Sequence, residues 1–220
     1  MTYIAHMNAE LVVDAEKYYT AMFNPEENSW NVRDRHFFRV LEKVLGHFER
    51  TRGHAQAVVW AHNSHIGDAR FAHLDASRCI SGGRDSSIGK LIKEHYRDVS
   101  LLVGMLTYHG DVMAADDWGG RPKKKMVRNA LSCSYEELLK RLSERGNETD
   151  FFLDLRVQKA VNLLEDASGG SRLERAIGVI YRPQTERMSH YYFSDVAKQF
   201  DLLCFIRRTK AVEPLDEEEG

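Results

Sequence analysis

Two stretches near the N-terminus repeat apolar residues every three or four positions, which predicts helices over residues 8–23 and 32–50. In the second stretch, apolar side chains share one stripe and charged side chains occupy the opposite face. The stripe consists of Phe37, Phe38, Leu41, Val44, Leu45 and Phe48. Asn31 lies just before it and belongs to a residue type that caps helix N-termini. We therefore expect a helix that begins after Asn31 and packs one face on a core.

Further along the chain, short apolar runs alternate with helical patterns. The runs predict strands at residues 56–61, 98–108, 149–156, 175–181 and 201–209. Helices are predicted at 86–96, capped by Ser86 or Ser87, and at 134–145, where Ser134 and Glu137 form a capping box. Apolar residues on consecutive strand positions indicate a strand covered on both faces. The order predicts an α/β fold with a mostly parallel sheet flanked by helices in three layers.

The remaining segments predict long loops and an acidic C-terminal tail. Residues 67–87 and 109–131 are rich in glycine and polar residues, which predicts long loops. The second of these contains the basic run 121–128, which we interpret as a solvated loop. With 220 residues and no repeat, we expect a single domain over 1–220 with an acidic tail at 212–220.

The composition is that of a globular protein and argues against nucleic-acid and membrane partners. Hydrophobic residues make up 43% and charged residues 29%, and the net charge is -2, so we expect no nucleic-acid partner. No apolar run approaches the roughly 18 residues that span a bilayer, so we expect no membrane partner either. The N-terminal sequence lacks the pattern of a secretion signal. Its cysteines, Cys79, Cys133 and Cys204, are widely spaced and are interpreted as free thiols, which favours the cytoplasm.

In the sequence VVWAHNSH, residues 58–65, polar side chains follow directly after a predicted buried strand. Ligands of open α/β sheets bind beyond the carboxyl ends of strands. An imidazole with an ordinary pKa accepts a proton from water or donates one to a leaving group. His62 and His65 are therefore candidate catalytic residues, with the amide of Asn63 between them as a candidate substrate contact.

Two other interpretations of the histidines stay open. Both imidazoles can simply cap the strand end and bond to loop carbonyls. Alternatively, they can hold zinc, with further ligands from Asp68, His73 or Asp75 nearby in sequence. Because the chain has neither an HExxH nor a CxxC motif, we expect no metal and no other cofactor.

Several motifs together resemble the erythromycin esterase family. These are SWNVRDRH, WAHNSH, LTYHG, AADDWGG, RAIGVIYRPQTERMSHYY and FDLLCFI, and the resemblance runs from about Asn8 to Leu215. It implies a hydrolase that opens an ester or macrolide lactone, hence antibiotic resistance in bacteria. The implied mechanism uses water activated by a histidine, supported by glutamates and an arginine, without an obligatory metal.

The resemblance also implies site residues. His62 and His65 match the two histidines of the family's WAHNxH motif, which face its active-site cleft. Arg33 and Arg35 match its WNxRDxH segment, where a guanidinium can hold a carboxylate or polarise a carbonyl. The alternative for both arginines is a salt bridge near a helix start. We expect a small-molecule ester or lactone as substrate.

One departure from the family affects activity. Members are longer, and this chain resembles their C-terminal half, whereas the N-terminal half carries the histidine proposed as general base and its glutamates. The resemblance therefore leaves two functions open: a hydrolase domain, or a non-catalytic subunit that binds a chain carrying the missing base. A sheet lacking part of its strands also exposes an edge, so we expect a complementing chain or self-association.

Overall fold

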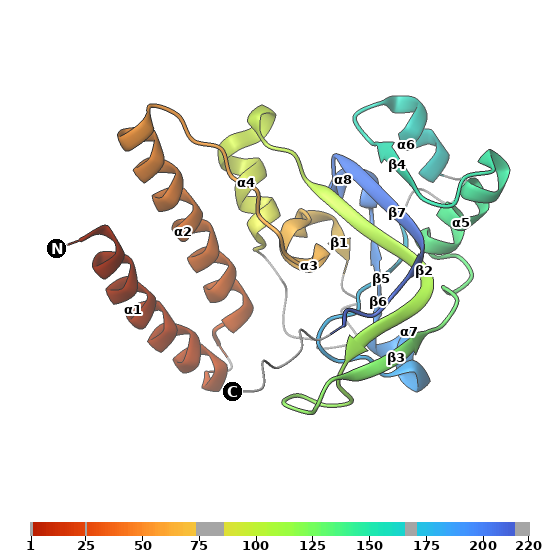
Figure 1. Cartoon of the computed structure of the whole chain (residues 1–220), viewed down its shortest axis with the longest axis horizontal. Helices are drawn as coiled ribbons and strands as arrows, with labels where there is room; N and C mark the ends of the chain where they lie inside the picture. Colours follow the sequence, from red (N-terminus) through yellow and green to blue (C-terminus); the bar gives the residue numbers. More distant parts are fainter. Residues whose placement is uncertain (1, 25, 74–85, 166–170, 214–220) are drawn as a thin grey trace. The chain divides into compact units, whose positions relative to one another are not determined.

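The computed structural model describes residues 2–24, 26–73, 86–165 and 171–213. It contains two compact units (Figure 1). The first unit is Met1–Val103 with Lys198–Phe200, and the second is Gly104–Ala197 with Asp201–Gly220. The single domain over 1–220 stays a prediction, and most of the predicted tail lies outside the described residues.

The first unit is mostly helical. It contains α1 (Tyr3–Phe23), α2 (Ser29–Arg52), α3 (Asn63–Ile66), the 3-10 turn η1 (Ala69–Phe71), the two-residue strand β1 (Ala72–His73), α4 (Ile88–Tyr96) and the 3-10 turn η2 (Arg97–Val99). α1 runs beside α2, and α2 also contacts α4 (Figure 1). The helices predicted at 8–23, 32–50 and 86–96 are therefore present, and the first two begin earlier than the apolar pattern indicates.

The start of α2 differs from the prediction because another asparagine caps it. The side chain of Asn28 accepts hydrogen bonds from the backbone N–H groups of Trp30 and Asn31, at 3.0 and 3.4 Å. The predicted cap, Asn31, lies inside the helix and is buried. At the other end, Gly53 adopts φ 80° and its N–H donates to the carbonyl of Glu49, which ends the helix.

The strand predicted at 56–61 is wrong. These residues form neither helix nor strand, and within the described part of the chain none of residues 55–61 makes a backbone hydrogen bond. Val58 is 93% exposed and Trp60 is 85% exposed. The apolar run has strand-forming residues, but no described strand pairs with it, and a strand forms only where a neighbour accepts its hydrogen bonds.

The second unit contains the sheets. Its elements are β2 (Val103–Ala114, whose first residue belongs to the first unit), β3 (Lys123–Val127), α5 (Tyr135–Gly146), β4 (Phe151–Asp154), α6 (Gln158–Leu164), β5 (Arg172–Arg175), the 3-10 turn η3 (Pro183–Thr185), α7 (Glu186–Ser189), β6 (Tyr191–Ser194), α8 (Val196–Gln199, whose last two residues belong to the first unit) and β7 (Leu202–Thr209). Four strands form one sheet in the order β3-β2-β7-β4. β5 and β6 pair separately.

The α/β class with a sheet flanked by helices is confirmed, but the strand directions are not those expected. β2 with β3, β4 with β7, and β5 with β6 all pair antiparallel. α5 packs against β5 and β7, and it buries Tyr135 and Leu139 almost completely. The helix predicted at 134–145 and its Ser134 cap are confirmed, since the Ser134 hydroxyl accepts from the Glu137 N–H at 3.2 Å.

Two predictions in this unit are wrong. Residues 109–131 are not simply a loop, because β2 extends to Ala114 and the basic run forms edge strand β3. Lysines are tolerated at a sheet edge, and the Nζ of Lys125 donates to the carbonyls of Ala115 and Tyr181. Residues 176–181 are not a strand apart from an isolated bridge at Ile180, whereas β6 was not predicted.

Across the described ranges, no helix has both the length and the apolar character needed to cross a bilayer.

Candidate functional site

The candidate site is built around His65, which lies at the C-terminal end of α3. Four residues of α2 contact its ring: Trp30, Arg33, Asp34 and Phe37. Their spacing of three, one and three residues places them on one face of the helix. One helix face therefore supplies a stacking ring, a cation, a carboxylate and an aromatic edge to a single imidazole.

Asp34 holds the orientation of His65. Its Oδ1 lies 2.8 Å from the His65 Nδ1, and the Asp34 side chain is completely buried. Because a carboxylate only accepts hydrogen bonds, Nδ1 carries the proton and donates it to Asp34. The neutral ring then has its lone pair on Nε2. His65 itself keeps 16% of its side chain exposed, and neither of the two cavities described below is lined by it.

Trp30 and Arg33 flank the same ring. The indole of Trp30 stacks on His65 with 4.3 Å between ring centroids and an angle of 3° between the planes. An Nη of Arg33 lies 3.5 Å from Nε2 of His65, at the long end of hydrogen-bond distances. The Arg33 guanidinium also lies over the Trp30 ring, 4.7 Å from its centroid. Stacking by Trp30 thus fixes one face of the imidazole, and a cation lies beside its unprotonated nitrogen.

The segment carrying His65 is fixed against α4 by close backbone approach. A Cβ at Gly89 would lie 2.0 Å from the carbonyl oxygen of Ile66, so only glycine fits there. The hydroxyl of Ser87 donates to the carbonyl of Gly67 at 2.7 Å and accepts from Lys90, which caps α4. The sequence expectation that Ser86 or Ser87 caps this helix is confirmed for Ser87.

Buried side chains of α2 also accept hydrogen bonds from backbone N–H groups at the start of α4. The Oδ2 of Asp34 accepts from the N–H of Ile88 at 3.3 Å, and the Oδ1 of Asn31 accepts from the N–H of Ser86 at 3.2 Å. The N-terminal N–H groups of a helix have no partner inside it and favour negative charge. Asp34 therefore joins three elements, since one oxygen holds His65 and the other holds α4.

His62 has a different role in the structure. Its Nδ1 accepts from the backbone N–H of Ser64 at 3.1 Å and lies 2.8 Å from the Ser64 hydroxyl, so it caps α3. The residue is exposed, and neither of the two cavities described below is lined by it. Asn63 is 8% exposed at the first position of α3. His62 therefore caps a helix, not the end of a strand, and it bonds to an N–H group and a hydroxyl and not to loop carbonyls. Roles for His62 and Asn63 in catalysis or binding stay predictions.

Arg35 lies apart from Arg33 despite their closeness in sequence. It is exposed on α2 and lines a cavity of about 350 Å³ together with α1 residues such as Glu16 and Thr20. Among the described residues, Arg35 makes no contact with His65. Of the two predicted arginines, the structure brings only Arg33 to the candidate site, because positions 33 and 35 differ by about 200° around a helix.

The residues considered for a metal do not assemble in the described part of the chain. No group of three or more His, Cys, Asp and Glu side chains there is placed to hold a metal ion. Asp68 instead accepts three side-chain bonds from Arg70, and Asp75 lies outside the described residues. The absence of a metal and of any other cofactor stays a prediction.

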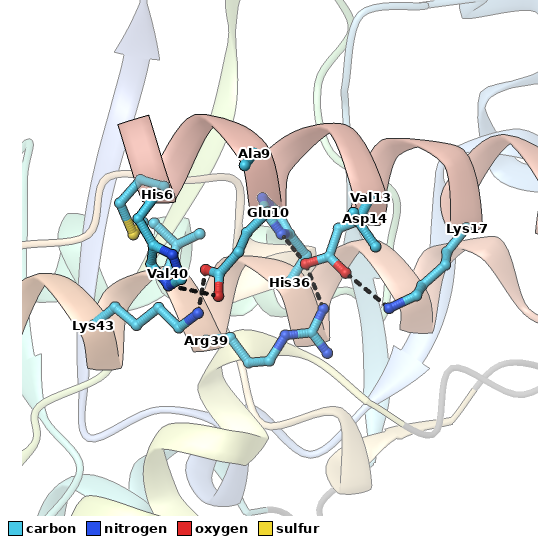
Figure 2. A pocket seen from close by; sticks show the side chains of 11 residues that line it. His6, Ala9, Glu10, Val13, Asp14, Lys17, His36, Arg39, Val40 and Lys43 are labelled. Carbon is cyan, nitrogen blue, oxygen red and sulfur yellow. Dashed lines mark hydrogen bonds and ion pairs between the residues drawn. The ribbon is translucent and has the colours of Figure 1, made fainter. Parts of the chain in front are cut away.

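A second cluster of charge lies between α1 and α2 (Figure 2). It lines a cavity of about 480 Å³. Asp14 of α1 accepts from Arg39 at 2.6 Å, from the His36 Nδ1 at 2.8 Å and from Lys17 at 3.4 Å. One turn earlier, Glu10 pairs with Lys43.

The carboxylates of this cavity are paired with neighbouring cationic side chains. Burial raises the pKa of Asp14, but hydrogen bonds from His36, Arg39 and Lys17 outweigh it and lower the pKa to about 2. The hydrogen bond from Lys43 lowers the pKa of Glu10. Both acids are therefore ionised near neutral pH and pair α1 with α2. We interpret this cavity as a structural ion-pair network.

Comparison with known proteins shows to which family the chain belongs. A family model described as erythromycin esterase matches residues 2–209. The chain belongs to the erythromycin esterase family. The family match includes both the α2 face and the His65 segment, so the contacts just described lie within the region that defines membership.

Two solved structures of low sequence identity share the fold. A succinoglycan biosynthesis protein is 18% identical with a TM-score of 0.61, and a Bacillus cereus protein is 16% identical with a TM-score of 0.60. Each match covers 83% of this chain and 39% of the other. An erythromycin esterase mutant in an open conformation is 12% identical, with a TM-score of 0.46, over 87% of this chain and 41% of that one. The chain thus spans about two fifths of the length of these structures.

Sequence reasoning missed Asp34 and Trp30 as partners of His65. Asp34 was noticed only as part of the WNxRDxH segment, and Trp30 was given no role. For Asp34 the signal was present in the helical period, since positions 33, 34 and 37 fall on one face of the predicted helix. Trp30 lies before the predicted start of that helix, so its position could be found only from the true start of α2 at Ser29. What the period cannot show is which later segment that face meets.

Proposed function

We propose that this chain is a hydrolase-type domain that opens an ester or lactone of a small molecule, with His65 as the residue that moves the proton. The observation that carries the proposal is the 2.8 Å contact between the His65 Nδ1 and the fully buried Asp34. A buried carboxylate that fixes one imidazole nitrogen leaves the other as a base of defined direction. Family membership supports the reaction class.

The reaction follows from this tautomer. A water molecule attacks the carbonyl carbon of the ester while Nε2 of His65 takes one of its protons. The carbon–oxygen bond to the alcohol then breaks, and His65 returns the proton to the departing oxygen. The products are a carboxylic acid and an alcohol, and the imidazole ends in its starting state. Asp34 keeps its hydrogen bond to Nδ1 throughout and stabilises the transient imidazolium.

Arg33 has a place in the same scheme. Its guanidinium lies beside Nε2, where negative charge forms on the carbonyl oxygen during attack. The long 3.5 Å contact with the imidazole is easily exchanged for a shorter one with that oxygen. We therefore assign Arg33 to the substrate carbonyl, and we assign no step to Arg35. His62, which is exposed, is assigned to the rim of the site, where it can contact the remainder of the substrate, and no substrate contact is assigned to the buried Asn63.

Hydrolysis of a chromogenic acyl ester and of a macrolide lactone tests the proposal. We expect His65→Gln to lower kcat by about 100- to 10,000-fold, the usual value of a positioned proton-transfer group. His54→Gln is the matched control, because His54 is exposed in the segment before α3 and makes no described contact with the site. Equal rates for the two variants, with folding verified by circular dichroism, would contradict the role of His65.

A second function has its own support. The apolar run before His62 is exposed, with Val58 at 93% and Trp60 at 85%. This exposure favours a subunit that binds a complementing chain carrying further catalytic groups. The same assay distinguishes the two: a wild-type rate equal to that of His65→Gln, restored only on mixing with a complementing chain, selects the subunit.

A further inference from the structure

The start of α4 is hydrogen-bonded to both sides of the His65–Asp34 pair. The backbone N–H of Ile88 donates to the Oδ2 of Asp34 at 3.3 Å. The residue before it, Ser87, bonds to the backbone of the segment that follows His65. Two adjacent residues thus hold the carboxylate and the segment that carries the imidazole. The start of α4 therefore sets how Asp34 and His65 meet.

The hydroxyl of Ser87 uses its full hydrogen-bonding capacity. A serine hydroxyl has one donor hydrogen and two acceptor lone pairs. It donates to the carbonyl of Gly67 at 2.7 Å and accepts from the N–H of Ala69 at 3.1 Å. It also accepts from the N–H of Lys90 at 3.1 Å, and this bond caps α4. Ser87 is 1% exposed, so two of three buried bonds hold the segment after His65.

Backbone contacts hold the same segment independently of the hydroxyl. A Cβ at Gly89 would lie 2.0 Å from the carbonyl oxygen of Ile66, and the N–H of Asp68 donates to the carbonyl of Gln199 at 3.1 Å. Removing the hydroxyl of Ser87 does not remove these contacts. A substitution at this position therefore tests the three hydroxyl bonds, while the surrounding backbone packing is kept.

Ser134 is a natural comparison, because it caps α5 in the same way. Its hydroxyl accepts from the N–H of Glu137 at 3.2 Å, and the residue is 0% exposed. Ser134 lies in the second unit, whereas Ser87 and His65 lie in the first. The two serines share burial and capping, and they differ in the bonds that Ser87 makes to the segment after His65.

We infer that Ser87 is a positioning residue for His65. Its hydroxyl holds the backbone after His65 against the start of α4, and the next residue of that start holds Asp34. The imidazole and the carboxylate are thereby kept in one arrangement. Ser87 acts through the backbone and takes no part in the proton transfer. The inference rests on the proposed function, in which His65 moves the proton, and it adds a residue that fixes the geometry of that site.

Nitrogen-15 NMR of the His65 imidazole in Ser87→Ala tests the inference without any substrate. The substitution leaves the carbonyl of Gly67 and the N–H of Ala69 without their partner. We therefore expect the ring to lose its fixed orientation, and the chemical shifts of its two nitrogens to move towards each other. Ser134→Ala removes the equivalent cap from α5 and should leave the His65 signals as in the wild type. Unchanged signals in Ser87→Ala, or an equal change in Ser134→Ala, would overturn the inference.

A glycine variant separates positioning from capping. Glycine is nearly as good as serine at a helix N-cap, but it has no hydroxyl to hold another segment. Ser87→Gly should therefore change the His65 signals as much as Ser87→Ala does. Wild-type signals in Ser87→Gly would show that Ser87 acts through its cap alone, which contradicts the inference.

Hydrogen exchange of the wild type needs no variant. We expect the amide of Ala69 to exchange about tenfold or more slowly than in an unstructured peptide, because its N–H donates to the buried hydroxyl of Ser87. An Ala69 amide that exchanges at the unstructured rate would show that this bond does not form, and the inference would fail.

Turnover separates this inference from the proposed function. In an active enzyme, Ser87→Ala should lower kcat about 10- to 100-fold with little change in KM, because a displaced base mainly affects the transition state. A wild-type kcat in Ser87→Ala would overturn the positioning role and leave the role of His65 standing. If the wild type itself hydrolyses no ester, the proposed function fails, and the His65 signals still decide whether Ser87 positions the ring.

Discussion

The two units of this chain are stabilised in different ways. In the second unit, the residues with the largest completely buried apolar side chains include Tyr135, Tyr181, Phe205, Leu106 and Leu139. In the first unit, only Ala21 among the 21 residues of α1 is buried, and that helix is paired with α2 through Glu10 and Asp14. The second unit therefore has an apolar core, whereas polar contacts position much of the first unit.

This difference matters for function because the candidate site lies in the unit with less apolar burial. A rigid orientation of His65 there depends on specific bonds from Asp34, rather than on tight packing alone. Sites that bind and turn over ligands need groups that are both fixed and reachable. The comparison predicts that substitutions in the second unit mainly lower stability, and that polar substitutions in the first mainly affect the site.

The largest stability effect is expected from truncating the core of the second unit. Phe205 is completely buried and packs on Phe151 with 5.3 Å between ring centroids. Phe205→Ala should lower the free energy of unfolding by about 3–5 kcal/mol, because it removes apolar burial and leaves a cavity. Urea denaturation measures the change. Phe48→Ala, at a residue of the first unit that is 41% exposed, is the matched control, and an equal loss there would contradict the comparison.

A smaller effect is expected from removing the carboxylate that joins α2, α3 and α4. Asp34→Ala leaves the N–H of Ile88 and the Nδ1–H of His65 without their acceptor, which should cost about 1–3 kcal/mol of unfolding free energy. Faster hydrogen exchange at Ile88 would accompany it. Asp117→Ala, at a side chain that is 77% exposed, should change stability by less than about 0.5 kcal/mol. An Ile88 amide unaffected by Asp34→Ala would contradict the account.

Lowering the pH should weaken the contact between α1 and α2. Asp14 has a pKa of about 2 in the folded chain against a usual 3.8, so its contribution to stability is complete above about pH 4 and is lost as the pH falls through about 2. Carboxyl NMR signals report the titration of Asp14, and amide signals of α1 report the separation. Asp14→Asn should abolish this pH dependence. An Asp14 carboxyl that titrates near 3.8 would show that the ion-pair network does not form.

The smallest effect is expected on the exposed face of α1. Leu11 is 51% exposed, so Leu11→Ser should change the free energy of unfolding by no more than about 0.5 kcal/mol. Thermal unfolding of the variant and the wild type measures this. A loss near that of Phe205→Ala would show that α1 is covered in solution by something that contacts Leu11.

The sequence predicted elements well where the signal is local. The periodic stripe located α2, and the capping box located α5 and its start at Ser134. It failed where an element depends on a distant partner. Residues 56–61 have the composition of a strand but nothing described to pair with, and the lysine-rich run became β3 because β2 lies beside it. Residue type alone does not encode whether a neighbour is present.

The site was predicted only in part for the same reason. The His62–His65 motif and Arg33 were found because they lie together in the sequence or match the family segment. The contact between Asp34 and His65 joins residues 31 positions apart, and only the fold of α2 against α3 brings them together. The structure also separates His62, which caps α3, from His65, which contacts α2. Two neighbouring histidines thus have different surroundings.

The central claim is that Asp34 fixes His65 with its proton on Nδ1 and its lone pair on Nε2. Nitrogen-15 NMR of the His65 imidazole tests this directly, because protonated and unprotonated ring nitrogens have well-separated chemical shifts. In the neutral ring, we expect a protonated Nδ1 and an unprotonated Nε2 in the wild type, and a mixture of both tautomers in Asp34→Asn. A wild-type ring protonated on Nε2, or a tautomer unchanged in Asp34→Asn, would contradict the account.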